Sequence, residues 1–277
     1  MRPSCVPQDR IHQGTYESAA AGAPVEYRVL TPPGWTGRER LPLVLVLHGA
    51  ASSAATLETQ APLYERCWAD GSLPPALAAC ASTPTVGGFY LDRPGHGGQW
   101  ETLAAQEFPA HLAREFGADL SRMALTGASM GGYGALKIAF RQPERFIAVA
   151  AMAPAVFPGE TAGQVPPRNT PSVLGQLLAE MRDSPAGYSG SHVVAVLRTG
   201  ADAIRRSGLS IMIECGDRDS FGLADGAEYL HRVLRDLDVS HDYHVIGGAD
   251  HVGPEVPRRQ ADVLLFLGNA LNQPRSY

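Results

Sequence analysis

The sequence feature that most constrains the fold is a G-x-S-x-G motif at residues 127–131, with Ser129 at its centre. An apolar strand pattern at 123–126 precedes the motif, and a helical pattern at 133–140 follows it. The two glycines allow a sharp turn from strand to helix, which lifts the Ser129 hydroxyl clear of the neighbouring backbone. The start of the helix also directs N–H groups and a positive dipole end toward developing negative charge. We therefore predict that Ser129 is a nucleophile; a glycine-rich turn with a capping serine is the alternative.

The same alternation of strand and helix patterns extends along most of the chain. Apolar, β-branched runs predict strands at 26–30, 43–47, 76–79, 122–126, 147–151, 209–214 and 241–246. Helical patterns lie at 102–116, 130–141, 223–237 and 257–271. This order predicts an α/β fold in which helices flank a mostly parallel central sheet. A chain of 277 residues can bury one such core, so we expect residues 1–277 to form a single domain.

The segment from 155 to 208 interrupts this alternation. It is rich in proline near its start and contains two helical patterns, at 172–181 and 191–198. Parallel strands need a crossover of only about a dozen residues, and this segment is far longer. We therefore predict a cap-like insertion over the sheet at 155–208. A longer helical crossover with no role at a site is the alternative.

Charge and hydropathy exclude several function classes. The formal net charge is −5, from 23 basic and 28 acidic residues without a basic block, so a nucleic-acid or anionic-membrane binder is not expected. The longest apolar run, 43–47, is too short to span a membrane. No hydrophobic segment follows residues 1–5, which predicts a cytoplasmic protein without a secretory signal.

The cysteine and glycine patterns argue against disulfides, metals and nucleotide cofactors. The four cysteines are widely spaced and are expected to be reduced thiols: Cys5, Cys67, Cys80 and Cys215. No metal-ligand spacing, P-loop or dinucleotide-binding fingerprint is present, so neither a metal nor a cofactor is predicted.

A serine hydroxyl is a weak nucleophile and needs a base that is itself held by a carboxylate. Two glycine-containing loops that follow late strand patterns supply the candidates. His251 is the predicted base, because it lies in a loop between the last strand and the last helix. Asp219 is the favoured acid, and Asp217 in the same loop is expected to form a turn or to pair with Arg218. Asp250 is too close to His251 in sequence to orient its ring.

An oxyanion hole needs two N–H donors close to the nucleophile. The first is expected from Met130, the residue after Ser129, and the second from the loop at 48–53 that follows an apolar strand pattern. Ala50 is our predicted second donor, with Ala51 as its nearest competitor. His48 is expected to brace this loop rather than to titrate in catalysis.

These residues resemble the α/β-hydrolase superfamily and, more narrowly, its esterase D/antigen 85 group. The resemblance rests on G-x-S-M-G-G-x-G-A-L at 127–136 and on the segment from Phe89 to Pro109, and it covers approximately residues 25–270. It implies an α/β-hydrolase fold and a triad in the order Ser129, Asp219, His251. It also implies a small-molecule ester substrate and no metal or organic cofactor.

The function that the resemblance implies is hydrolysis of a carboxylic ester or thioester through an acyl-Ser129 intermediate. An acyltransferase that passes the acyl group to an alcohol or amine would use the same triad and is the alternative. A non-catalytic binding protein on this fold would be expected to lack a triad residue, and none is missing. Gly131 and Gly132 differ from the antigen 85 pattern, and the loop at 49–53 lacks the extended pattern of S-formylglutathione hydrolase. Both departures weigh against those particular substrates.

Aromatic side chains are candidates for the substrate pocket, with packing in the core as the alternative. They are Phe89, Tyr90, Trp100 and Phe157.

Overall fold

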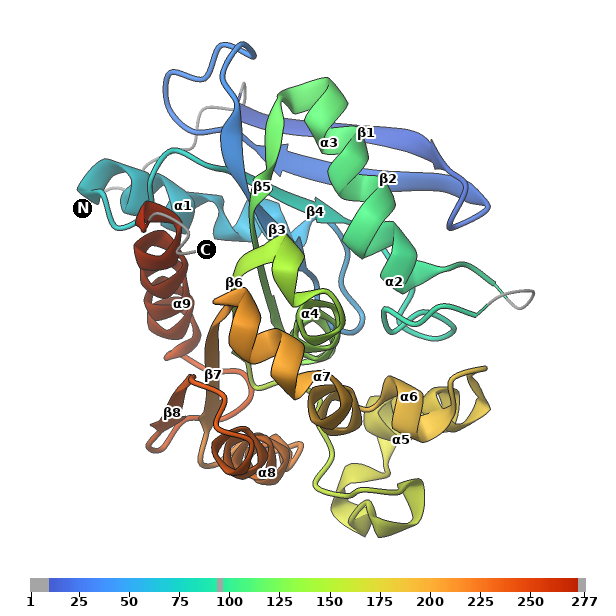
Figure 1. Cartoon of the computed structure of the whole chain (residues 1–277). Helices are drawn as coiled ribbons and strands as arrows, with labels where there is room; N and C mark the ends of the chain where they lie inside the picture. Colours follow the sequence, from blue (N-terminus) through green and yellow to red (C-terminus); the bar gives the residue numbers. More distant parts are fainter. Residues whose placement is uncertain (1–9, 94–96, 274–277) are drawn as a thin grey trace.

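The computed structural model describes residues 10–93 and 97–273 of the chain. At its centre is an eight-stranded sheet with the strand order β1-β2-β4-β3-β5-β6-β7-β8 (Figure 1). The strands are β1 (Ile11–Ser18), β2 (Ala23–Leu30), β3 (Leu41–Leu47), β4 (Leu77–Ala81), β5 (Ala118–Ala128), β6 (Phe146–Met152), β7 (Ser210–Gly216) and β8 (Asp242–Ile246). Along the order β4-β3-β5-β6-β7-β8 each strand is parallel to the next, whereas β2 pairs antiparallel with both β1 and β4. The predicted mostly parallel sheet is confirmed.

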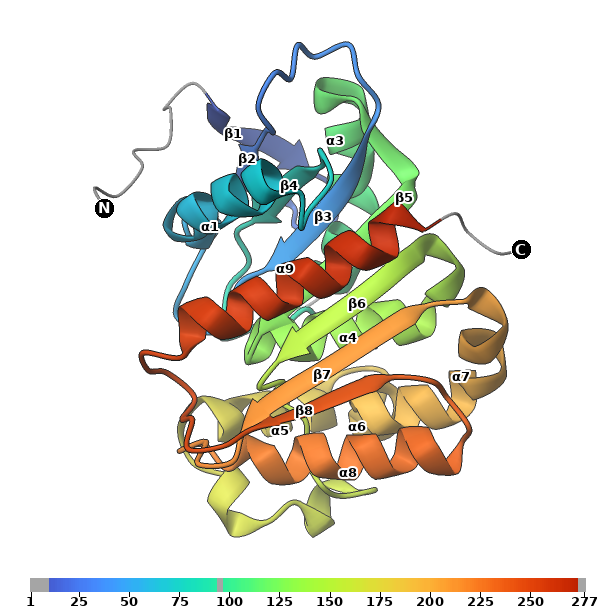
Figure 2. The ribbon, with the colours of Figure 1, turned by 90° about the vertical axis from the view of Figure 1, so that its left-hand side faces the viewer.

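Helices cover both faces of this sheet. The α-helices of the described residues are α1 (Thr56–Asp70), α2 (Trp100–Thr102), α3 (Phe108–Phe116), α4 (Met130–Arg141), α5 (Ser172–Asp183), α6 (Gly187–Ser191), α7 (Val193–Ser207), α8 (Leu223–Asp236) and α9 (Val256–Asn272). Helices α1 and α9 lie on one face, and α4, α7 and α8 lie on the other (Figure 2). The helix predicted at 130–141 has the bounds of α4, and the one predicted at 102–116 is a continuous run of α2, a π-helical turn (Leu103–Glu107) and α3.

The central strands contribute side chains to two hydrophobic cores. In β3, residues 43, 45 and 47 belong to the core on the α4 side, and residues 44 and 46 belong to the core on the α1 and α9 side. Because both faces of the sheet are covered, every residue from 42 to 47 is buried. The uninterrupted apolar run in the sequence is therefore the expected pattern of a central parallel strand.

Strand β1 and helix α1 are among the elements that the sequence prediction lacks. Strand β1 is an edge strand whose residues are mostly polar and only partly buried, so its apolar signal is weak. Helix α1 contains Pro62 in its interior, which lowers the helical propensity of that segment.

The segment between β6 and β7 has two parts. Helix α7 packs against α4 and returns the chain to β7, so it is the crossover helix of a parallel pair. Residues 153–192, with α5 and α6, precede it and lie outside the α4–α7 layer (Figure 1). We call residues 153–192 the cap segment. The predicted cap-like insertion thus corresponds to its first part, and the alternative of a helical crossover describes α7.

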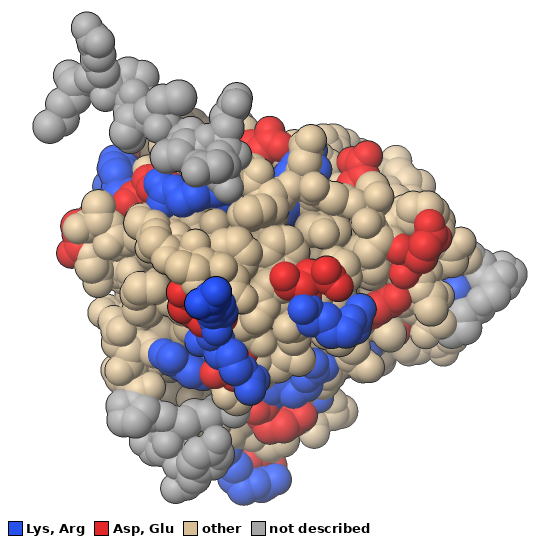
Figure 3. All heavy atoms as spheres, turned by 90° about the horizontal axis from the view of Figure 1, so that it is seen from above, with Lys and Arg blue, Asp and Glu red and all other residues tan. Residues whose placement is uncertain are grey.

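On the face shown in Figure 3, acidic and basic side chains are interspersed. No helix in the described ranges is long and apolar enough to cross a membrane. Cys67, Cys80 and Cys215 are free and buried, as predicted, and Cys5 lies outside the described residues, as do residues 1–5 as a whole.

Candidate active site

Ser129 lies at a strained turn between β5 and α4. Its φ of 55° and ψ of −117° are rarely adopted by residues other than glycine, and such strain is common where a side chain is presented for function. A Cβ atom on Gly131 would lie 1.9 Å from the Leu47 carbonyl oxygen, and one on Gly127 would lie 2.4 Å from the carbonyl carbon of Gly131. Glycine is therefore required at both ends of the motif, and the predicted sharp turn is confirmed.

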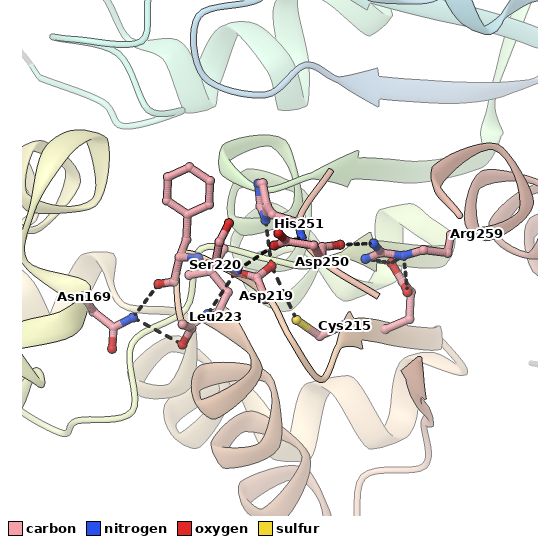
Figure 4. A network of polar contacts seen from close by, with 11 residues as sticks. Asn169, Cys215, Asp219, Ser220, Leu223, Asp250, His251 and Arg259 are labelled. Carbon is pink, nitrogen blue, oxygen red and sulfur yellow. Dashed lines mark hydrogen bonds and ion pairs between the residues drawn. The ribbon is translucent and has the colours of Figure 1, made fainter. Parts of the chain in front are cut away.

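The loops that follow β7 and β8 bring Asp219 and His251 together. The Nδ1 atom of His251 lies 2.7 Å from Oδ2 of Asp219, and the two side chains point toward each other in Figure 4. The other oxygen, Oδ1, accepts hydrogen bonds from the backbone N–H groups of Phe221 at 2.9 Å and Leu223 at 3.3 Å. A carboxylate oxygen accepts from Nδ1–H, so the lone pair of the imidazole remains on Nε2, where a general base needs it.

The other two candidate aspartates link the same loops without contacting the imidazole ring. Asp217 Oδ1 accepts from the Gly248 N–H at 2.7 Å. Asp250 Oδ1 accepts from the N–H groups of Ser220 at 2.7 Å and His251 at 2.5 Å. Each loop thus supplies a carboxylate that holds the backbone of the other. The described contacts favour Asp219 as the partner of His251. Asp217 links the two loops, whereas we predicted that it forms a turn or pairs with Arg218.

A buried ion pair, which our sequence analysis does not identify, fixes the histidine loop to the sheet. Arg259 at the start of α9 forms a two-pronged contact with Glu214 on β7, with Nε–Oε2 at 2.9 Å and Nη2–Oε1 at 2.8 Å. Its Nη1 atom donates to the carbonyl oxygen of Asp250 at 2.8 Å. The side chains of Arg259 and Glu214 are both almost completely buried. Burial raises the pKa of Glu214, and the guanidinium of Arg259 opposes that rise. In the sequence, the one sign of this ion pair is Glu214, a single glutamate in a mostly apolar strand pattern.

The loop at 48–53, from which we predicted an oxyanion-hole donor, is held by a neutral histidine. The N–H of Thr83 donates to Nε2 of His48 at 2.9 Å, and Nδ1 of His48 lies 2.8 Å from the carbonyl oxygen of Gly49. Because a backbone N–H can only donate, Nε2 must accept and the proton must be on Nδ1. Burial also lowers the pKa of His48, which keeps the ring neutral. The expectation that His48 braces this loop agrees with these contacts.

This contact determines where the Ala50 N–H points. The Gly49 carbonyl and the Ala50 N–H belong to one planar peptide and point in opposite directions. By holding the carbonyl, His48 therefore fixes the N–H. The N–H of Ala51 donates instead to Oγ1 of Thr85 at 2.8 Å. These contacts support Ala50 over Ala51 as a donor. Met130 is the first residue of α4, so its N–H has no acceptor within the helix.

The aromatic residues considered for the pocket lie in the core or pack against it. Phe89, Tyr90 and Phe157 are at most 1% exposed. The hydroxyl of Tyr90 donates to the carbonyl oxygen of His48 at 3.1 Å, so this residue lies against the loop at 48–53. Trp100 is partly buried against the same core. Phe89, Tyr90 and Phe157 are therefore core residues, as the alternative to a pocket role had it, and they offer no surface to a substrate.

The described residues contain no group of three or more histidine, cysteine or acidic side chains arranged to hold a metal.

Residues 18–254 match the sequence model of the Esterase family. The chain belongs to the Esterase family. This assignment confirms the predicted resemblance to serine esterases.

Individual proteins similar to this chain have names that are more specific than that of the family. An S-formylglutathione hydrolase of Paracoccus denitrificans (strain Pd 1222) is 31% identical in an alignment of 169 residues that covers 54% of this chain and 59% of that protein. The match thus spans less than two thirds of the relative's length. A ferulic acid esterase structure has a TM-score of 0.77 at 19% identity and covers 95% of this chain and 98% of its own. An S-formylglutathione hydrolase structure from Agrobacterium tumefaciens has a TM-score of 0.77 at 23% identity, with 95% of both chains covered. These likenesses confirm the predicted α/β-hydrolase fold.

Proposed function

We propose that the protein is a serine hydrolase that cleaves a carboxylic ester or thioester through an acyl-Ser129 intermediate. The observation that carries this proposal is the 2.7 Å contact between His251 Nδ1 and Asp219 Oδ2, in a chain whose Ser129 lies at a strained strand-to-helix turn. This pairing leaves Nε2 of His251 free to accept a proton, which is the property that a serine nucleophile requires of its base.

The first half of the reaction forms the acyl-enzyme. His251 Nε2 takes the proton of the Ser129 hydroxyl as its Oγ attacks the carbonyl carbon of the substrate. The negative charge that develops on the carbonyl oxygen is stabilised by the N–H groups of Ala50 and Met130. When this tetrahedral species collapses, the bond to the leaving group breaks, and the protonated His251 gives its proton to the departing alkoxide or thiolate. Asp219 remains ionised and stabilises the imidazolium while it exists.

The second half regenerates the enzyme. A water molecule gives a proton to His251 Nε2 and attacks the acyl carbon, and collapse of the new tetrahedral species releases the carboxylic acid and returns the proton to Ser129 Oγ. An alcohol or amine in place of water would give acyl transfer by the same steps. The names of the relatives, S-formylglutathione hydrolase and ferulic acid esterase, refer to a thioester and to esters of an aromatic acid and support a small-molecule acyl substrate of this kind.

The test is turnover of p-nitrophenyl esters, from acetate to long acyl chains, by the wild type and by Ser129→Ala. We expect Ser129→Ala to lower turnover by about 10⁴-fold or more, because the acyl-enzyme can no longer form. Alanine replaces serine without adding an atom, so the thermal unfolding temperature should change little. Retention of wild-type turnover by this variant would refute the proposal. Adding an alcohol or amine acceptor and measuring the partition of products separates hydrolysis from acyl transfer.

A further inference from the structure

The cap segment contacts the loop that carries the catalytic acid. We call residues 217–223 the acid loop. Asn169 ends a short 3-10 turn of the cap segment, η5 (Pro167–Asn169). Its Nδ2 atom donates to the carbonyl oxygens of Phe221 at 3.1 Å and Gly222 at 3.3 Å. Figure 4 shows Asn169 reaching the acid loop from the side opposite to Arg259.

The two carbonyl groups that Asn169 holds belong to the peptides that support Asp219. The Gly222 carbonyl shares a planar peptide with the N–H of Leu223, which donates to Oδ1 of Asp219 at 3.3 Å. The Phe221 carbonyl shares a peptide with the N–H of Gly222, which donates to the backbone oxygen of Asp219 at 2.9 Å. In each peptide the carbonyl faces Asn169 and the N–H faces Asp219. One amide group therefore orients two of the donors around the acid.

The chemistry of the Asn169 side chain points to a donor role. Asn169 is fully buried, and its Oδ1 has no hydrogen-bond partner among the described residues. The end of the amide that faces the acid loop contacts two carbonyl oxygens. Because carbonyl oxygens can only accept, that end must be the NH₂ group. A buried amide with an unsatisfied oxygen costs stability that an apolar side chain of similar size would not. What the amide supplies at this position is its two N–H groups.

Other contacts bring the same two segments together. Gly222 has a φ of 69°, and a Cβ atom on it would lie 3.2 Å from Nδ2 of Asn169. Arg168 forms an ion pair with Asp225, but both side chains are largely exposed, so this pair contributes little. The acid loop also contacts the base directly, because the Phe221 ring lies edge-on to the His251 ring at a centroid distance of 4.7 Å. Displacement of the acid loop would therefore move both the Asp219 carboxylate and the Phe221 ring that packs against the His251 imidazole.

We propose that Asn169 is a positioning residue, through which the cap segment sets the orientation of Asp219 and hence of His251. This inference rests on the proposed function, since it assigns the acid loop to the triad. It makes the cap segment part of the catalytic geometry.

The test compares two variants that remove the donor. Asn169→Leu keeps the approximate size and removes the unpaired oxygen, and Asn169→Asp keeps the shape but carries no N–H. We expect kcat on a p-nitrophenyl ester to fall about 10- to 100-fold in both variants with little change in KM, as for a misplaced catalytic group. The unfolding temperature of Asn169→Leu should change little, because removal of the unpaired Oδ1 offsets the loss of the two hydrogen bonds to the acid loop. Thr170→Val is the matched control, because the Thr170 hydroxyl donates only within its own turn, to Pro167, among the described contacts.

A proton NMR measurement separates this inference from the proposed function. The His251 Nδ1–H that points at Asp219 should give a downfield resonance, which is assigned by its loss in His251→Gln. We expect this resonance to shift or broaden in both Asn169 variants and to stay unchanged in Thr170→Val. A folded Asn169→Leu protein with wild-type kcat and an unchanged resonance would overturn the positioning role, as would a change confined to KM. A wild type without ester turnover would instead overturn the proposed function, while the resonance would still report on Asn169.

Discussion

The two sides of the candidate site are built in different ways. On the serine side, backbone packs directly against backbone: Gly131 at the start of α4 approaches the end of β3 so closely that a Cβ atom would meet the Leu47 oxygen at 1.9 Å. On the acid–histidine side, the loops after β7 and β8 also meet through their backbones, since the Arg218 N–H donates to the Ala249 carbonyl oxygen at 3.1 Å, but here side-chain hydrogen bonds add further links. These come from Asp217, Asp250, Arg259 and Asn169.

This difference predicts how each side responds to substitution. Direct backbone packing leaves no room for an added atom, so one methyl group must displace a strand or a helix. Several side-chain clamps share the work of holding the other two loops, so loss of one is expected to cause a graded effect whose size depends on burial. The predictions below test this contrast.

Gly131→Ala is expected to have the largest effect. The added Cβ would overlap the Leu47 carbonyl and lie 2.9 Å from the carbonyl oxygen of His48, so the turn that presents Ser129 cannot form as it stands. We expect a loss of about 3 kcal/mol or more in unfolding free energy, at or beyond the upper end for overpacking, or failure to fold. Urea unfolding and soluble yield measure this. Gly163→Ala is the control, because nothing lies within 4 Å of a Cβ there. A Gly131→Ala protein with wild-type stability and turnover would show that the close approach is not required.

Arg259→Met tests the buried, charged clamp of the acid–histidine side. It leaves the Glu214 carboxylate buried without its partner and frees the Asp250 carbonyl, for an expected cost of about 3–5 kcal/mol in unfolding free energy at neutral pH. Urea unfolding at several pH values provides the measurement. The methionine fills much of the space of the arginine stem, so the loss reports mainly on the charge.

The pH dependence of this loss has a definite sign. Burial raises the pKa of Glu214, and without the opposing guanidinium it should rise further. A carboxyl whose folded pKa exceeds its unfolded pKa contributes stability that is present below the unfolded value and is lost as pH rises through the folded value. The deficit of Arg259→Met should therefore be smaller at pH 5 than at pH 8. Adding Glu214→Gln should remove this pH dependence and recover part of the stability. A deficit that is larger at pH 5 contradicts the argument.

The same contrast explains which parts of the site the sequence predicts. The serine turn is local, since a strand pattern, two glycines and a helix pattern lie within about twenty residues, and the predicted bounds of α4 agree with the structure. The acid and histidine loops could be located because each follows a strand pattern, and the choice of Asp219 over Asp217 agrees with the described contacts. These predictions depend on chain order and on steric rules that involve near neighbours.

The clamps could not be predicted because they join residues far apart in the chain. Asn169 lies in a polar, proline-rich stretch where nothing in the pattern distinguishes it from the exposed Thr170 beside it. In the sequence, Arg259 resembles any charged residue near the start of a helix. Only the structure shows its ion pair with Glu214. The aromatic side chains at 89 and 90 resemble pocket residues in sequence, yet both have positive φ values that turn them into the core.

Asp217→Ala should show the smallest effect, and its comparison with Asp219→Ala decides the identity of the acid. Asp217 is exposed and accepts one bond, from the Gly248 N–H, which water can replace, so we expect a loss of about 1 kcal/mol or less in stability and turnover within about threefold of wild type. Asp219→Ala removes the only carboxylate that contacts the imidazole among the described residues and should lower kcat by about 10³-fold or more. Steady-state kinetics on one ester ranks the two. If Asp217→Ala were the more damaging, the loop contacts of Asp217 would be catalytic support and Asp219 would not be the acid.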